Sequence, residues 1–174
     1  TATISPKGVA LAGEVADGFM PIWTSPEGLA MFDEPLETGF AKAGNGKSFD
    51  NFDIYPMINV AVNDDVARCR DFFRPAIALY VGGMGARNKN FYNDLVSRLG
   101  WEAAAKEIQD LYLDGKKKEA TAAVPDDLVD ALTLIGSKER IAERVAAWKE
   151  SRATCLLLTG VNHESLEVMA EICL

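Results

Sequence analysis

Apolar residues recur at helical spacing from the start of the chain. Val9, Ala12 and Val15 follow Ser5, a residue type that commonly begins helices. The pattern ends at Gly18, where a glycine can close a helix. We therefore expect a helix over residues 5–17 with Gly18 as its cap.

Two apolar runs predict the first strands. The run "GFMPIW" (residues 18–23) ends in an aromatic residue, as a buried strand often does. Thr24 or Ser25, followed by Pro26, then predicts the start of a second helix. Residues 34–52 are rich in glycine, lysine and asparagine, which predicts a loop. The run "FDIYPMINVAV" (residues 52–62) predicts a strand that is buried on both faces.

The middle of the chain carries mainly helical patterns. Asn63 begins a helix that Pro75 interrupts, and its apolar pattern resumes to Val81. The glycine-rich stretch "VGGMGARNKNF" is a break in the pattern. Further helices are expected over residues 91–99 and 101–113 and from Pro125 onward.

The end of the chain alternates between strand and helix. An apolar run at residues 132–136 precedes a helix that begins at Ser137, a strand is expected at residues 155–158, and residues 163–174 predict an amphipathic helix. Nearly all-apolar strands that alternate with helices predict an α/β fold with a parallel sheet. Only three such strands are evident in 174 residues, so we expect the chain to form part of a domain.

Charge and composition narrow the classes of function. Lys and Arg total 18 against 26 Asp and Glu, whereas nucleic-acid binding requires a surplus of cations. No apolar run reaches the roughly 20 residues that span a bilayer, and no signal peptide is evident. The cysteines Cys69, Cys155 and Cys173 are far apart, two of them in apolar surroundings, and a single histidine argues against a zinc site. We therefore expect a cytoplasmic protein with reduced thiols and no metal, nucleic-acid or membrane ligand.

Two motifs carry a resemblance to a known family. The stretches "SPKGVALAGEVADGF" and "LIGSKERIAERVAAWKESRATCLLLTG" occur in an order that resembles the second half of the luciferase-like family of flavin and deazaflavin oxidoreductases. The resemblance is strongest to the branch that depends on coenzyme F-420, and it extends over essentially the whole chain. Members of this family fold as (β/α)8 TIM barrels. The resemblance implies that residues 1–174 form one partial domain, the C-terminal half of such a barrel, with parallel strands, outer helices and a helical insertion at about 63–130, the N-terminal half being absent.

The resemblance also implies a role for the opening helix. In the family, the turn before this helix binds the phosphate of the flavin-type cofactor through main-chain amides, and a helix N-terminus favours an anion in general. Carried onto this chain, the cofactor-binding residues are Ile4, Ser5, Pro6 and Lys7, with the Ser5 hydroxyl as an extra donor. This chain has Ile4 where the family commonly has glycine. The alternative interpretation is an ordinary N-capped helix.

Four residues are candidates for the substrate pocket, each with a structural alternative. Trp23 and Thr24 end a strand and should point toward the mouth of the barrel, although Trp23 suits the core equally well. Arg87, in the glycine-rich break, could meet an anionic substrate or the acidic tail of the cofactor, or be a solvated loop charge. His163 is near the mouth by topology, but a lone histidine there is more often a helix-start residue than a proton donor.

The resemblance implies an oxidoreductase that transfers a hydride between coenzyme F-420, a deazaflavin, and a small organic substrate. The catalytic residues stay unassigned, because family members take most of their acid and base groups from the first four strands of the barrel. Two alternatives stay open: a luciferase-like monooxygenase with FMN as its cofactor, and an inactive truncated or split half-barrel. Unpaired strand edges also predict a homodimer, or association with the missing N-terminal half.

Overall fold

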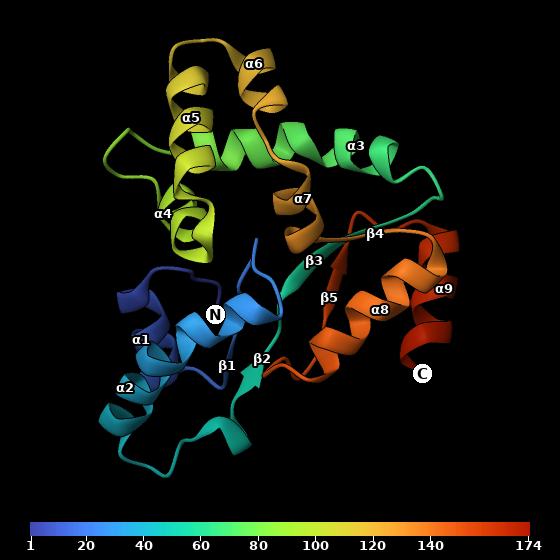
Figure 1. Ribbon diagram of the computed structural model, residues 1–174. Coiled ribbons are helices and arrows are strands. Elements are labelled where there is room, and N and C mark those ends of the chain that lie inside the picture. Colours follow the sequence, from blue (N-terminus) through green and yellow to red (C-terminus); the bar gives the residue numbers. More distant parts are fainter.

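The computed structural model describes all residues 1–174, and short parallel strands alternate with helices along the chain (Figure 1). The strands are β1 (Gly18–Phe19), β2 (Asp53–Ile54), β3 (Met57–Val62), β4 (Thr133–Gly136) and β5 (Leu157–Thr159). The α-helices are α1 (Pro6–Val15), α2 (Asp33–Ala43), α3 (Val66–Ala78), α4 (Phe91–Val96), α5 (Glu102–Leu113), α6 (Lys117–Ala122), α7 (Asp126–Leu132), α8 (Lys138–Lys149) and α9 (His163–Cys173). The fold also has two short 3-10 helices, η1 (Glu27–Phe32) and η2 (Phe49–Asn51). It has two π-helical segments, η3 (Leu79–Gly83) and η4 (Ser97–Trp101).

All strand pairs are parallel. β1 pairs with β2, and β3 lies between β4 and β5. Isolated parallel bridges extend this arrangement, from Ala2 to Met20 and from Ile22 to Met57. The segment at Ala2, β1, the β2–β3 segment and β5 therefore follow one another across one parallel sheet. Parallel pairing requires crossover connections, which the helices supply.

The strand expected at residues 52–62 is two strands. Tyr55 and Pro56 separate β2 from β3, because proline has no N–H to donate to the ladder. The carbonyl of Pro56 still accepts a hydrogen bond from Leu157 N–H at 2.9 Å, so the chain remains in the sheet. The last strand begins later than expected, at Leu157, and Cys155 lies outside it.

The prediction of a loop at residues 34–52 is wrong for its first ten residues, because these belong to α2. The signals for this helix are in the sequence: Asp33 and Glu34 lie in its first turn, and Leu36 and Phe40 share its buried face. Gly44 then ends the helix in the left-handed conformation at φ 65°.

Gly18 does not cap α1, contrary to the expectation. The C-cap is Ala16 in an extended conformation, and Gly18 is the first residue of β1. A Cβ atom at Gly18 would lie 2.7 Å from the carbonyl oxygen of Asp53, its partner in the parallel ladder. The glycine is therefore needed for close approach of two strands rather than for a turn.

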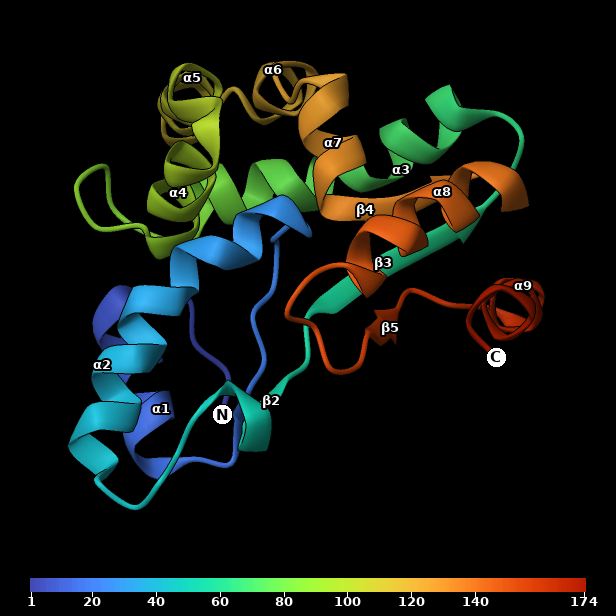
Figure 2. The same ribbon diagram turned by 60° about the horizontal axis from the view of Figure 1, so that its bottom comes forward.

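The helices gather in three groups around the strands. Figure 2 shows α1 and α2 together on one side, α3 to α7 together on another, and α8 and α9 beside β5. Helices α3 to α7 all lie between β3 and β4 in sequence. One cluster of buried apolar residues joins the groups, so the chain has a single core. None of the helices has the length and apolar composition that crossing a bilayer requires.

The three cysteines are free, but only one of them is in apolar surroundings. Cys69 is buried, whereas Cys155 and Cys173 are exposed, which corrects the expectation of two. Burial raises the pKa of the Cys69 thiol.

Candidate functional site

The N-terminus of α1 carries the predicted cofactor-binding residues. Ser5 is the N-cap, and its side-chain oxygen accepts a hydrogen bond from Gly8 N–H at 3.2 Å. Pro6 has no N–H, and the backbone N–H groups of Ser5 and Lys7 have no acceptor in the protein. The Ser5 hydroxyl proton also remains available for donation. This helix end can therefore offer backbone and hydroxyl donors, together with the positive end of the helix dipole, to an anion.

A hollow of about 730 Å³ lies at the N-terminus of α1, and we call it the first hollow. Three of its lining residues were predicted from the sequence, and four come from α4 and η4. They are Ser5, Pro6, Lys7, Phe91, Asp94, Ser97 and Arg98. The guanidinium of Arg98 donates to the carbonyl of Ile4 at 3.1 Å, which ties η4 to the turn before α1. Two cations thus face a single carboxylate in a hollow that also has free backbone donors.

Ile4 contributes its backbone rather than its side chain. The residue is 9% exposed and belongs to the buried core cluster. Its side chain therefore packs inside the protein, and Ile4 does not line the first hollow.

The residues missed from the sequence are those on α4 and η4. Gly100 adopts φ 105° and interrupts the helical geometry, which places Ser97 and Arg98 at a helix end. The sequence did indicate the break at Gly100, because one helix was expected before this residue and another after it. The contact of Arg98 with Ile4 joins residues 94 positions apart, and no local pattern reports such a contact.

Trp23 and Thr24 are buried at the end of their strand segment. Trp23 is 5% exposed and adopts φ 57°, and it is the one non-glycine residue with positive φ. Its indole Nε1 is buried without a hydrogen-bond partner. Strained backbone of this kind collects at functional sites, where the surrounding structure holds it in place. Thr24 is fully buried, and its hydroxyl donates to the carbonyl of Ser25 at 3.4 Å.

A row of aromatic rings joins Trp23 to Tyr92 on α4. The Trp23 and Tyr80 rings meet edge-on at 5.5 Å, and the Tyr80 and Tyr92 rings meet at 4.8 Å. Tyr92 follows Phe91, which lines the first hollow. Burial raises the pKa of Tyr92, so this phenol stays protonated at neutral pH. Tyr80 lies in the π-helical segment η3, a feature that often marks functional sites.

A second hollow, of about 590 Å³, adjoins the first through Arg98, which lines both. Its walls come from η1, η4, α7 and α8. The lining residues are Ser25, Glu27, Gly28, Met31, Arg98, Leu99, Trp101, Asp127, Asp130, Ala131 and Arg144. Ser25 directly follows Thr24, so the strand end predicted to reach the substrate pocket leads into this hollow.

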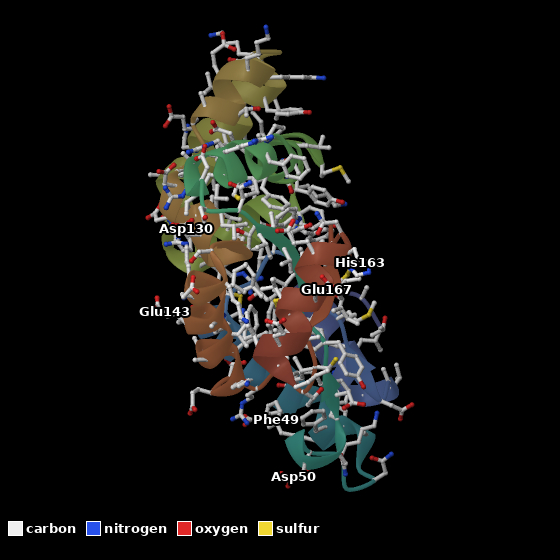
Figure 3. All side chains as sticks on the ribbon, turned by 90° about the vertical axis from the view of Figure 1, so that its right-hand side faces the viewer. Phe49, Asp50, Asp130, Glu143, His163 and Glu167 are labelled. Atoms are coloured by element: carbon white, nitrogen blue, oxygen red, sulfur yellow. The ribbon has the colours of Figure 1, made fainter.

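Arg87 and His163 lie away from both hollows. Arg87 forms ion pairs with Asp110 on α5 and with Asp114, the residue that caps α5, the latter at 2.7 Å. His163 begins α9, is exposed, and lies 3.3 Å from Glu167; Figure 3 shows both residues on α9, across the view from Asp130. The structure therefore does not bring these two residues together with Ser5 and Lys7, and their role in substrate binding stays a prediction.

A third hollow, of about 320 Å³, lies at the carboxyl ends of β3 and β5. Asn162 and Ser165, close to His163 on the chain, line it together with Arg68. No group of three His, Cys, Asp or Glu side chains is arranged to hold a metal ion in the structure.

Comparisons with known proteins identify relatives of this chain. A family model described as luciferase-like monooxygenase matches residues 1–155. The chain is 35% identical over 167 residues to "Putative coenzyme F420-dependent oxidoreductase Rv3520c" of Mycobacterium tuberculosis, a match that covers 96% of this chain and 48% of that protein.

Two solved structures share the fold. The coenzyme F420-dependent tetrahydromethanopterin reductase of Methanopyrus kandleri superposes with a TM-score of 0.74 at 17% identity, covering 98% of this chain and 48% of its own. An F420-dependent secondary alcohol dehydrogenase, solved in complex with an F420-acetone adduct, superposes with a TM-score of 0.64 at 18% identity, covering 98% and 46%. The predicted α/β fold of the luciferase-like barrel type is confirmed, and the chain spans about half the length of the relatives it matches.

Proposed function

The chain belongs to the luciferase-like monooxygenase family, and from that membership we propose that its protein is an oxidoreductase that transfers a hydride between coenzyme F-420 and a small organic substrate. The choice of cofactor is supported by the curated relative that is 35% identical over 96% of this chain and is named for F420 dependence. The observation that carries the proposal is the first hollow, where free backbone donors and two cations converge.

The residues of the first hollow suit the phosphate of such a cofactor. The backbone N–H groups of Ser5 and Lys7 are unpaired, and a phosphate oxygen is a strong acceptor for them. The side chains of Lys7 and Arg98 add positive charge, and Arg98 has no carboxylate partner. Asp94 opposes them, but the helix dipole and the two cations outweigh one carboxylate.

The residues of this chain bind and orient the cofactor rather than perform the chemistry. When bound, coenzyme F-420 supplies the hydride chemistry itself. Ser5, Lys7 and Arg98 would hold its phosphate end, and the exposed ring of Phe91 offers an apolar wall beside them. We assign no catalytic acid or base to this chain.

Location and partners complete the proposal. Three free cysteines support a cytoplasmic location, where thiols stay reduced. The open edges of the parallel sheet, at β5 and at the segment of Ala2, support either a homodimer or a second half of the barrel as partner. The helices between β3 and β4 are proposed as an insertion into the barrel at about residues 63–130.

Titration with coenzyme F-420 and, separately, with FMN tests the cofactor assignment. The protein from the full reading frame that encodes this chain is titrated while cofactor fluorescence is recorded. We expect F-420 to bind more tightly than FMN, and Lys7→Gln and Arg98→Gln each to weaken F-420 binding by about tenfold. Lys118→Gln, an exposed lysine outside the first hollow, serves as the matched control and should leave binding unchanged.

Other outcomes select the alternatives. Preferential binding of FMN, with oxygen consumed when the bound flavin is reduced, would instead indicate a monooxygenase. Binding of neither cofactor would indicate an inactive half-barrel. Equal loss of affinity in Lys118→Gln would show that bulk charge rather than the first hollow attracts the cofactor.

A further inference from the structure

The second hollow has the size and the mixed lining of a small-molecule site. Its volume of about 590 Å³ falls within the range of ligand pockets, about 300–1,000 Å³. Met31, Leu99, Trp101 and Ala131 supply apolar surface. Gly28 lets η4 approach η1 here, because a Cβ atom would lie 2.3 Å from the Leu99 side chain.

Arg144 on α8 lines this hollow and has donors without partners. Its Nε is buried without a hydrogen-bond partner. Its only ion pair is a long one, from NH1 to Glu27 at 3.4 Å. A guanidinium carries five N–H donors, and a buried donor without an acceptor is costly. The Nη2 group of Arg144 also has no partner, and the side chain is 32% exposed. Because Arg144 lines the hollow, an acceptor bound there can meet this end of the guanidinium.

Arg98 in η4 supplies further donors to the second hollow. It makes one hydrogen bond, to the carbonyl of Ile4, and no ion pair. The two arginines line the same hollow from η4 and α8. Two guanidinium groups with spare donors are the arrangement that recognises a carboxylate.

The carboxylates of the hollow are already engaged. Asp130 is held by Arg70 at 2.6 Å and by Arg140 at 2.8 Å. Asp127 accepts hydrogen bonds from the Trp101 indole at 3.2 Å and from Leu128 N–H at 2.9 Å. These carboxylates already have donors of their own, and the three acidic groups of the hollow, counting Glu27, would repel a dianion.

We propose that the second hollow binds the substrate of the proposed reaction, and that this substrate is a small apolar molecule bearing one carboxylate held by Arg98 and Arg144. The proposal rests on the proposed function, because Arg98 also lines the cofactor hollow and so places the two ligands side by side. The apolar body of the substrate would lie against Met31, Leu99 and Trp101.

A matched pair of probes tests this assignment. 4-Phenylbutyrate and 4-phenylbutan-1-ol differ only in the carboxylate and are titrated by calorimetry, with tryptophan fluorescence as a second signal. The carboxylate should bind about tenfold more tightly than the alcohol, and Arg144→Gln and Arg98→Gln should each remove that preference. Arg68→Gln is the control, because Arg68 also lacks a carboxylate partner but lines the third hollow.

The outcomes separate this proposal from the proposed function. Arg144→Gln should leave F-420 affinity unchanged, since Arg144 does not line the first hollow. Carboxylate-selective binding without any F-420 binding would retain the site and overturn the proposed function. Equal binding of the two probes, or a preference that survives Arg144→Gln, would overturn the site. Should Arg144→Gln fail to fold, Ala131→Leu fills the hollow without touching the arginines and must abolish binding of both probes.

Discussion

At the scale of single residues, Trp23 combines two unfavourable features in one place. It adopts a left-handed backbone conformation at φ 57°, and its indole N–H is buried without an acceptor. Each feature costs of the order of 1–3 kcal/mol. The packing of the ring against Tyr80 and the core offsets these costs. Trp23 therefore lowers the free energy of unfolding through its backbone and its indole N–H, at the end of a strand segment that leads into the second hollow.

Replacing Trp23 separates the ring from its N–H group. Trp23→Phe keeps an aromatic ring but removes the unpaired donor, so we expect the free energy of unfolding to change by less than about 1 kcal/mol. Trp23→Ala removes the ring as well and should cost about 3–5 kcal/mol. Urea denaturation measures both variants. A loss above about 2 kcal/mol in Trp23→Phe would show that the indole N–H has an acceptor in solution.

At the scale of elements, the sequence predicts what is local. The helices that begin at Ser5 and Ser137 are confirmed, because a capping residue and an apolar face occur within one segment. The helix at α2 was missed because glycine and lysine suggested a loop, although Leu36 and Phe40 carried the helical spacing. The residues of α1 that line the first hollow were predicted from the sequence. Its other wall was not, since Arg98 reaches Ile4 only in the folded chain.

Asp130 joins three helices and makes their packing sensitive to acid. It lies on α7 and binds Arg70 of α3 through two hydrogen bonds, at 2.9 and 2.6 Å, and Arg140 of α8 at 2.8 Å. Burial alone would raise the pKa of Asp130, but the hydrogen bonds and charges of Arg70 and Arg140 outweigh it and hold the pKa below its ordinary value of 3.8. The carboxylate therefore stabilises the folded state at neutral pH.

The pH dependence of unfolding tests this role. Because the folded pKa is lowered, the stabilisation is complete above the unfolded value near 3.8 and is lost as the pH falls through the folded value. Asp130→Asn should cost about 2 kcal/mol at pH 7 and should flatten the loss of stability below pH ~4. Asp71→Asn removes a carboxylate that is 76% exposed and is the control, expected to change stability by less than about 0.5 kcal/mol. An unchanged acid limb in Asp130→Asn would assign the acid sensitivity to other carboxylates.

At the scale of the whole molecule, the chain is more open than a compact protein of its mass. Its accessible surface is 8986 Å², whereas a folded monomer of this mass exposes about 8,300 Å². The three groups of helices in Figure 2 surround the strands without enclosing them. Along β5, the backbone N–H of Leu157 points to β3, so the backbone N–H and C=O of Leu158 face the open side of the sheet. Leu158 and Leu157 are only half-buried. The open surface thus coincides with an unpaired parallel edge.

Such an edge is a template for another strand, so the 174-residue chain produced by itself should associate. We expect light scattering to show a mass that rises from 18.9 kDa with concentration. Addition of the other half of the barrel, from the longer relatives or from the same reading frame, should suppress this association because it pairs with the same edge. The exposed Cys155 and Cys173 could also link chains, so the measurement is repeated with both changed to serine. A mass that stays at the monomer value in that variant, at every concentration, would show that the edge is protected within the chain itself.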